Sequence, residues 1–145
     1  MTSQLNVDTI VDKAGSGGTN VKVANTSTYV SDGGNVTQNT VQGLLKGWSN
    51  FTMVTTTAHR DSFNCGTLTD NGTGSATVNL TNPFSNDDWA GSMYTNTYGT
   101  ETTYSNHFAG GFDNRTSSSV RVATNNGSSS VDAALNDVLF AGDLA

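Results

Sequence analysis

Short stretches in which apolar and polar residues alternate run from residue 51 to the C-terminus, and clusters of Gly, Asn and Asp separate them. Alternation with a period of two places every second side chain on one face, as in a β-strand that is half buried in a sheet. Many short strands between turns are typical of a small β-sandwich or barrel. We predict strands over residues 51–57, 62–70, 75–81, 89–96, 104–108, 119–125 and 131–140.

Two turn signals indicate where neighbouring strands form hairpins. Residues 70–74 read DNGTG, and residues 125–127 read NNG. Asn and Gly adopt positive φ angles at little energetic cost, which the tight turns of hairpins require. We therefore predict a hairpin turn at each of these two positions.

The composition favours an all-β chain over a helical one. Thr, Asn, Ser and Gly make up about half of the 145 residues, and only 12% of the residues are charged. Long surface helices need Ala, Glu, Lys and Leu, and Glu101 is the only glutamate. The hydrophobic fraction of 34% is below the roughly 45% of an ordinary globular domain. We therefore expect copies of the chain to associate and to bury more apolar surface together.

Charge and cysteine content exclude several classes of protein. The net charge is −6, whereas binding to a nucleic-acid backbone needs a basic surface. No apolar run approaches the roughly 20 residues of a membrane span, and residues 1–10 do not resemble a signal peptide. A single cysteine, Cys65, excludes an internal disulfide, and we interpret it as a buried small side chain. We expect neither nucleic-acid binding nor membrane insertion.

The sequence lacks the spacings that mark catalytic or metal sites. His59 and His107 lie far apart, and no H-x-x-x-H, C-x-x-C or G-x-S-x-G pattern occurs. The paired carboxylates Asp87 and Asp88 could indicate a glycosidase, but they lie near Pro83 in a turn, where Asp bonds to its own backbone. We predict that the chain is not an enzyme and needs neither a metal nor a cofactor.

The residues before the strands follow two other patterns. Residues 1–38 contain short apolar stretches between glycine clusters, and none of them could form a core alone. Within residues 39–48, the apolar side chains lie at i, i+3, i+4 and i+7, which predicts one face of a two-turn helix with Asn39 as its N-cap. These apolar residues are Val41, Leu44, Leu45 and Trp48. We predict an N-terminal segment (1–38), a helical neck (39–48) and a C-terminal β-sandwich (49–145).

Several motifs together resemble a known module. Residues 46–51 (KGWSNF), 60–64 (RDSFN), 68–80 (LTDNGTGSATVNL) and 119–122 (SVRV) are similar to the C-terminal β-domain of tail-fibre proteins from marine bacteriophages, especially cyanophages. Residues 5–10 (LNVDTI) resemble the opening of many such fibres. The resemblance covers about two thirds of the chain.

The resemblance implies a structural protein of the virion, located on the particle surface at the tail or neck. It implies a homotrimer in which the N-terminal strands of three chains intertwine. The helical neck would hold the three chains in register, and the sandwiches would mediate receptor binding and host attachment. We expect the N-terminal segment to contact other virion proteins through Leu5, Val7, Ile10 and Val11.

Residues 92–118 depart from the family pattern and are rich in aromatic and Asn residues. Aromatic faces stack on sugar rings, and neutral polar side chains bond to hydroxyl groups. We expect a host-surface glycan or protein as the ligand, whereas Trp89 is expected in the core. The candidate ligand-binding residues are Tyr94, Tyr98, Tyr104 and His107.

Three further hypotheses stay open. The chain could be a protein that decorates or cements the capsid or neck, or it could be a monomeric carbohydrate-binding module. A monomer would leave the apolar stripe of the neck exposed to water. As a structural hypothesis, Arg60 with Asp61 and Arg121 with Asp132 form charge pairs that fix strand register or join subunits.

Overall fold

The computed structural model describes residues 27–30, 37–40, 43–96 and 109–144. The chain divides into two compact units, Met1–Val41 and Gln42–Ala145. In the first unit, β1 (Thr28–Val30) pairs antiparallel with β2 (Thr37–Asn39). Tyr29 of β1 is 66% exposed.

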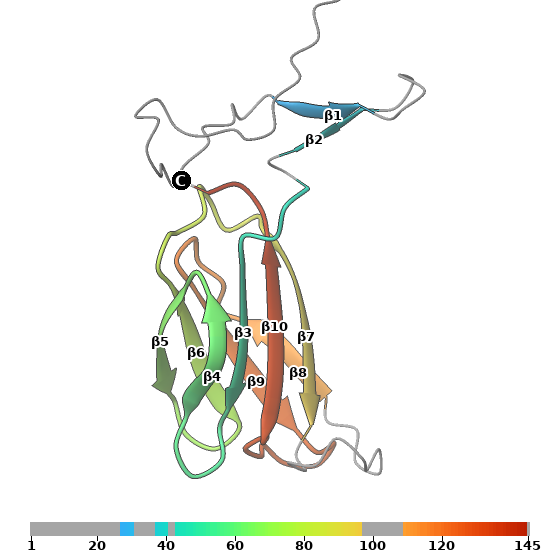
Figure 1. Ribbon diagram of the computed structural model, residues 1–145. Coiled ribbons are helices and arrows are strands. Elements are labelled where there is room, and N and C mark those ends of the chain that lie inside the picture. The colour runs from blue at the N-terminus through green and yellow to red at the C-terminus, as the bar shows by residue number, and fades with distance from the viewer. Residues whose placement is uncertain (1–26, 31–36, 41–42, 97–108, 145) are drawn as a thin grey trace, which may run out of the picture. The chain divides into compact units, whose positions relative to one another are not determined.

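The second unit consists of two four-stranded antiparallel sheets that face each other in a sandwich-like arrangement (Figure 1). Sheet I contains, in order, β4 (Ala58–Phe63), β3 (Gly47–Thr52), β10 (Leu135–Ala141) and β7 (Ala90–Asn96). Sheet II contains β5 (Cys65–Asp70), β6 (Ser75–Leu80), β9 (Ser119–Asn125) and β8 (Ala109–Asp113). The predictions of an all-β class and of a sandwich are confirmed.

The core lies between the sheets and follows from the alternation in each strand. Val78 of β6 and Val122 of β9 are fully buried, as are Phe51 of β3 and Val138 of β10. Trp89 is 3% exposed, as predicted for a core residue. Its indole NH donates to the Thr116 carbonyl at 2.9 Å, and its ring packs on those of Phe84 and Phe140.

One fully buried polar side chain, Asn136 of β10, is satisfied within this core. Its Oδ1 accepts from Thr95 Oγ1 at 2.9 Å, and its Nδ2 donates to the carbonyls of Ala133 and Phe51. A buried amide without these partners would destabilise the fold, so they hold β10 in register with β3 and β7.

The helical neck predicted for residues 39–48 is wrong wherever the structure describes it. Asn39 ends β2, residues 43–46 form a turn and an extended segment, and Gly47 begins β3. The Lys46 amide already donates to the Phe140 carbonyl, so the chain joins β10 here. A two-turn helix is marginal in water, and sheet pairing satisfies the same backbone groups.

The strands predicted at 75–81, 89–96 and 119–125 are confirmed to within one residue at each end. The strand predicted at 51–57 is displaced, because the observed β3 starts and ends earlier. The strand predicted at 131–140 was placed too early, because β10 begins at Leu135. The segment 104–108 lies outside the described residues, and β8 was not predicted.

The predicted strand 62–70 is two strands, one in each sheet, separated by Asn64. Asn64 has φ 56°, and its Nδ2 donates to the carbonyls of Lys46 and Asn82 at 2.8 and 3.1 Å. Its Oδ1 accepts from the Asn82 amide at 2.7 Å. Asparagine tolerates this left-handed conformation better than most residues, so Asn64 turns the chain from sheet I to sheet II.

The predicted DNGTG hairpin turn is confirmed. Gly72 and Gly74, between β5 and β6, have φ angles of 101° and 71°. The Ser75 amide donates to the Gly72 carbonyl at 2.9 Å, which closes the turn. Gly127, after β9, has φ 86°. At this second predicted turn, Asn125 makes only an isolated antiparallel bridge to Ser130, and the chain then continues to β10 in the other sheet.

Candidate functional site

The outer face of sheet I carries an unusual row of apolar side chains. Strand pairing aligns Phe63 of β4 with Trp48 of β3, and Trp48 with Leu139 of β10. Their sequence neighbours on β3 and β10 point into the core, so these side chains point outward. Phe63 is 55% exposed, Leu139 is 43% exposed, and Trp48 is partly buried. We call these three residues the apolar row.

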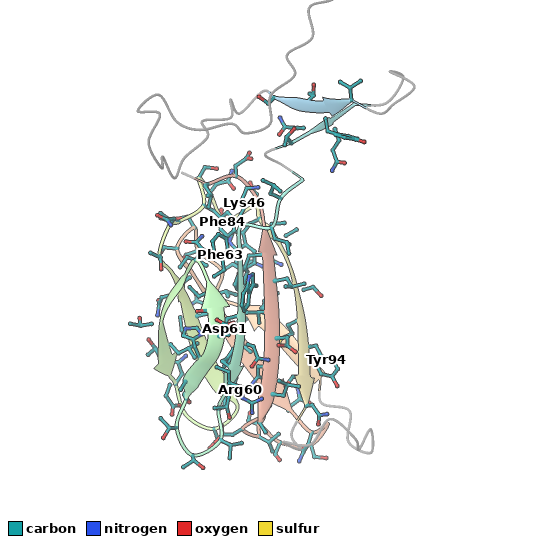
Figure 2. All side chains as sticks on the ribbon, in the orientation of Figure 1. Lys46, Arg60, Asp61, Phe63, Phe84 and Tyr94 are labelled. Atoms are coloured by element: carbon teal, nitrogen blue, oxygen red, sulfur yellow. The ribbon has the colours of Figure 1, made fainter. Side chains whose placement is uncertain are left out.

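The adjacent row of the same face is polar. Pairing aligns Asp61, Asn50, Asp137 and Tyr94 across the four strands. Asn50 Nδ2 donates to Asp137 Oδ1 at 2.5 Å, which holds that carboxylate in place. Figure 2 shows Phe63 and Asp61 on β4, at one edge of sheet I, and Tyr94 on β7, at the other edge.

A shallow apolar hollow lies at the β7 edge of this face. Its volume is about 290 Å³, and its lining includes small residues of β7 and β10 between larger ones. Leu139 aligns with Ser92, so the apolar row leads directly into the hollow. We call this feature the hollow, lined mainly by Leu45, Ala90, Ser92, Leu139 and Ala141.

The structure places some of the predicted neck residues at this face. Leu44 and Leu45 precede β3 and are 59% and 52% exposed, and Leu45 lines the hollow. Trp48 belongs to the apolar row, whereas Val41 lies outside the described residues. Leu45 and Trp48 therefore lie on the same exposed surface, as predicted, but this surface is a sheet face and the predicted surface was one side of a helix.

Of the predicted ligand-binding residues, the structure describes Tyr94, which is 51% exposed. Tyr98, Tyr104 and His107 lie outside the described residues. The N-terminal contact residues Leu5, Val7, Ile10 and Val11 also lie outside them.

Sequence reasoning missed Phe63 and Leu139. Leu139 lies inside the apolar run Val138-Leu139-Phe140, in which alternation is invisible. Phe63 was assigned to one continuous strand with residues of β5. Alignment of β10 with β3 would have shown that Leu139 and Trp48 share a face.

The histidine of β4 joins the two sheets. His59 Nε2 lies 3.0 Å from the carbonyl of Gly66 in β5, and Nδ1 lies 2.6 Å from Ser49 Oγ. A carbonyl only accepts hydrogen bonds, so Nε2 carries the proton and Ser49 donates to Nδ1. Ser49 is 1% exposed, so a substrate has no access to its hydroxyl group. We assign this pair a structural role.

Two predicted charge pairs have other partners. Arg121 of β9 binds Asp113 of β8 through two hydrogen bonds, from Nε at 2.5 Å and from Nη2 at 2.7 Å. Asp132 instead accepts from the Gly74 amide at 2.7 Å, so its predicted pairing with Arg121 is wrong. Arg60 Nη2 donates to the Ala134 carbonyl at 2.8 Å.

The remaining candidate groups are structural or unclustered. Asp87 and Asp88 lie in an exposed turn, as predicted, and the hydrogen bond of this turn runs from the Asp88 amide to Asn86 Oδ1 and uses no Asp carboxylate. Among the residues that the structure describes, no three His, Cys, Asp or Glu side chains cluster closely enough to hold a metal ion. Within the same described ranges, no helix is long and apolar enough to cross a membrane.

The outer face of sheet II is polar and internally bonded. Asn79 Nδ2 donates to the Thr67 carbonyl at 3.0 Å, and Asn71 Nδ2 donates to Thr77 Oγ1 at 2.8 Å. The Arg121–Asp113 pair completes this face. Several of its polar groups already bond to one another, so the apolar row and the hollow are the stronger candidate for contact with another molecule.

Comparisons of the chain with protein-family models, with curated proteins and with solved structures each give no match.

Proposed function

We propose that the chain is a structural protein of a bacteriophage virion, a short trimeric fibre whose β-sandwiches adhere to the host surface. In this proposal the N-terminal segment attaches the fibre to the particle. Three copies present three equivalent sandwiches, so weak individual contacts combine into a higher avidity.

The outer face of sheet I is the observation that carries this proposal. Phe63, Leu45 and Leu139 are each at least 43% exposed, and each lies on the outer face of sheet I or lines its hollow. Contiguous apolar surface of this kind marks a contact site in a soluble protein. A second and third copy of the chain would cover it.

The motifs that resemble tail fibres also support the proposal, because several of their residues have structural roles. Asn64 makes the crossing between sheets, and Gly74 supplies a positive φ angle in the turn between β5 and β6. The resemblance therefore concerns the framework, and it agrees with the sandwich that these residues form.

The first test is the mass of the full-length chain in solution, by multi-angle light scattering. We expect three times the 15.1 kDa of one chain. A mass of one chain at all concentrations would contradict the trimeric fibre. A second test uses gold-labelled antibody against the chain on phage particles that carry it, and we expect label at the tail or neck. Label spread over the capsid would favour a decoration or cement protein.

The apolar row and the adjacent polar row of sheet I favour a second candidate function, that of a monomeric carbohydrate-binding module. Phe63 could stack on a sugar ring, and Asp61 and Asn50 in the adjacent row could bond to its hydroxyl groups. A glycan array with the full-length chain tests this function. Glycan binding that is lost in Phe63→Ala, with a single-chain mass, would replace the fibre proposal.

A further inference from the structure

We infer that Phe63 of one copy inserts into the hollow of the next copy, and that this contact closes a ring of three sandwiches. The inference rests on the trimeric assembly proposed above and names the surface that makes it. It follows from three observations on sheet I: an exposed aromatic side chain at one edge, a hollow at the other edge, and their alignment in one row.

The two edges have complementary shapes. Phe63 is 55% exposed on the edge strand β4. The hollow, of about 290 Å³, lies at the edge strand β7. A benzene molecule fits a cavity of about 150 Å³, so the hollow has room for a phenylalanine ring. Leu45 and Leu139 would flank this ring, and the small side chains Ala90 and Ser92 leave the space for it.

The alignment of these features decides between a ring and a filament. Phe63, Trp48, Leu139 and Ser92 are successive partners across the four strands, so Phe63 and the hollow lie at the same height along the strands. A contact between different surfaces of identical chains builds a ring when each copy is only rotated, and a helix when each copy also rises. Equal height requires no rise, so the contact closes.

The width of the sheet favours three copies. Neighbouring strands lie about 4.8 Å apart, so a four-stranded face is roughly 15–20 Å wide. Three such faces around an axis parallel to the strands each lie about 5 Å from it, which is half the roughly 10 Å between packed sheets. Side chains of the size of Trp48 and Leu139 fill this space. Four or more copies would leave an open channel at the axis.

The polar row sets the salt dependence of this ring. Asp137 lies on the central strand β10, next to Leu139 on the same face. In a ring of three copies, the three Asp137 carboxylates therefore all face the axis. Their repulsion opposes association, whereas burial of the apolar row drives it. Salt screens charge repulsion, so we expect the trimer to dissociate less as the salt concentration rises from 0.05 to 0.5 M.

Variants of the full-length chain test the contact by mass and by cross-linking. Phe63→Ser removes the inserted ring, and Ser92→Phe fills the hollow. We expect each to need at least about tenfold more chain to form trimers than the unchanged protein. Val54→Ser is the matched control, because Val54 is 43% exposed but lies in the loop after β3, and its mass is expected to stay at three chains. Unfolding curves confirm that each variant is folded.

The double variant Phe63→Cys with Ser92→Cys tests the pairing directly. This variant and both single variants also carry Cys65→Ala, so that the native thiol cannot cross-link. With oxidised glutathione as the oxidant, we expect covalent dimers and trimers and no larger species on a non-reducing gel. Each single cysteine variant gives no such series. Dimers from Phe63→Cys alone would show a face-to-face contact and overturn the ring.

The outcomes separate this inference from the proposed fibre. An unchanged chain with the mass of one copy overturns both. A trimer that survives Phe63→Ser and Ser92→Phe and is not cross-linked by the double variant overturns the inference alone. Loss of glycan binding in Phe63→Ser, with the trimer intact, would also overturn it and assign Phe63 to a ligand.

Discussion

The two sheets of the second unit share one core but differ in what their outer faces present. Sheet II shows hydroxyl and amide groups that bond to one another, together with the exposed Arg121–Asp113 pair. Sheet I shows the apolar row and a hollow of about 290 Å³. Both faces arise from the same alternation of residues in strands, so alternation alone does not decide which face meets water. On the proposal made above, sheet II faces solvent and sheet I faces another copy of the chain.

The largest effect should come from a charge placed on each outer face in turn. Leu139→Lys puts an ammonium group in the middle of the apolar row, and burying it against another chain would be costly. We expect the trimer to dissociate to a mass of one chain in light scattering. Thr69→Lys makes the same change on sheet II and should leave the trimer mass unchanged. Equal effects of the two variants would show that the faces do not differ in function.

The next largest effect concerns the hairpin of sheet II. A Cβ atom on Gly74 would lie 2.6 Å from the Thr124 carbonyl oxygen and 2.7 Å from the Val131 amide nitrogen, whereas a Cβ atom on Gly72 would meet nothing within 4 Å. Both residues have positive φ. We expect Gly72→Ala to cost about 1 kcal/mol of unfolding free energy and Gly74→Ala to cost about 3 kcal/mol or more. Urea unfolding measures both, and equal costs would contradict the predicted backbone clash.

In the corresponding hairpin of sheet I, between β3 and β4, a substitution in the turn should raise the unfolding free energy. Thr55 has φ 66°, and the Thr56 amide donates to the Val54 carbonyl at 2.7 Å, so Thr55 is the middle residue of a tight three-residue turn. A β-branched residue is strained in this conformation. We expect Thr55→Gly to raise the unfolding free energy by about 0.5–1 kcal/mol. A lower value in the urea unfolding curve of this variant would contradict the strain.

The smallest effect is expected from the ion pair on sheet II. The hydrogen bonds from Arg121 lower the pKa of Asp113 below its usual value. The pair therefore stabilises the fold above the pKa of an unfolded Asp, near pH 4, and its contribution disappears as the pH falls through the lowered pKa. Asp113→Asn should slightly lower the melting temperature at pH 7 and should lower it less near pH 2. The same difference at both pH values would exclude this linkage.

The sequence predicted those parts of the fold in which local pattern and final environment agree. Residues 119–125 alternate cleanly, because Val120, Val122 and Thr124 all enter the core, and the predicted strand matches β9. The DNGTG turn was predictable because Gly72 and Gly74 supply the positive φ angles.

Other parts depend on residues far apart in the chain. Asn64 turns the chain because its amide group binds the carbonyls of Lys46 and Asn82, each 18 residues away. Leu44, Leu45 and Trp48 fit a helical spacing, but pairing of the chain with β10 outweighs two turns of helix. Of the candidate site, the sequence identified Leu45, Trp48 and Tyr94, and it missed Phe63 and Leu139, which only strand pairing brings to the same face.

The reactivity of the only thiol in the chain, Cys65, offers a measure of how often the sandwich opens. Cys65 opens β5 directly after the Asn64 corner, and its Sγ donates to the Trp48 carbonyl of sheet I at 3.3 Å. Burial raises the pKa of Cys65 to about 11. Only the thiolate reacts readily with alkylating reagents, so at neutral pH the folded chain is modified about a hundredfold more slowly than an unfolded one. The alkylation rate therefore reports how often the two sheets part at this corner, without any added label.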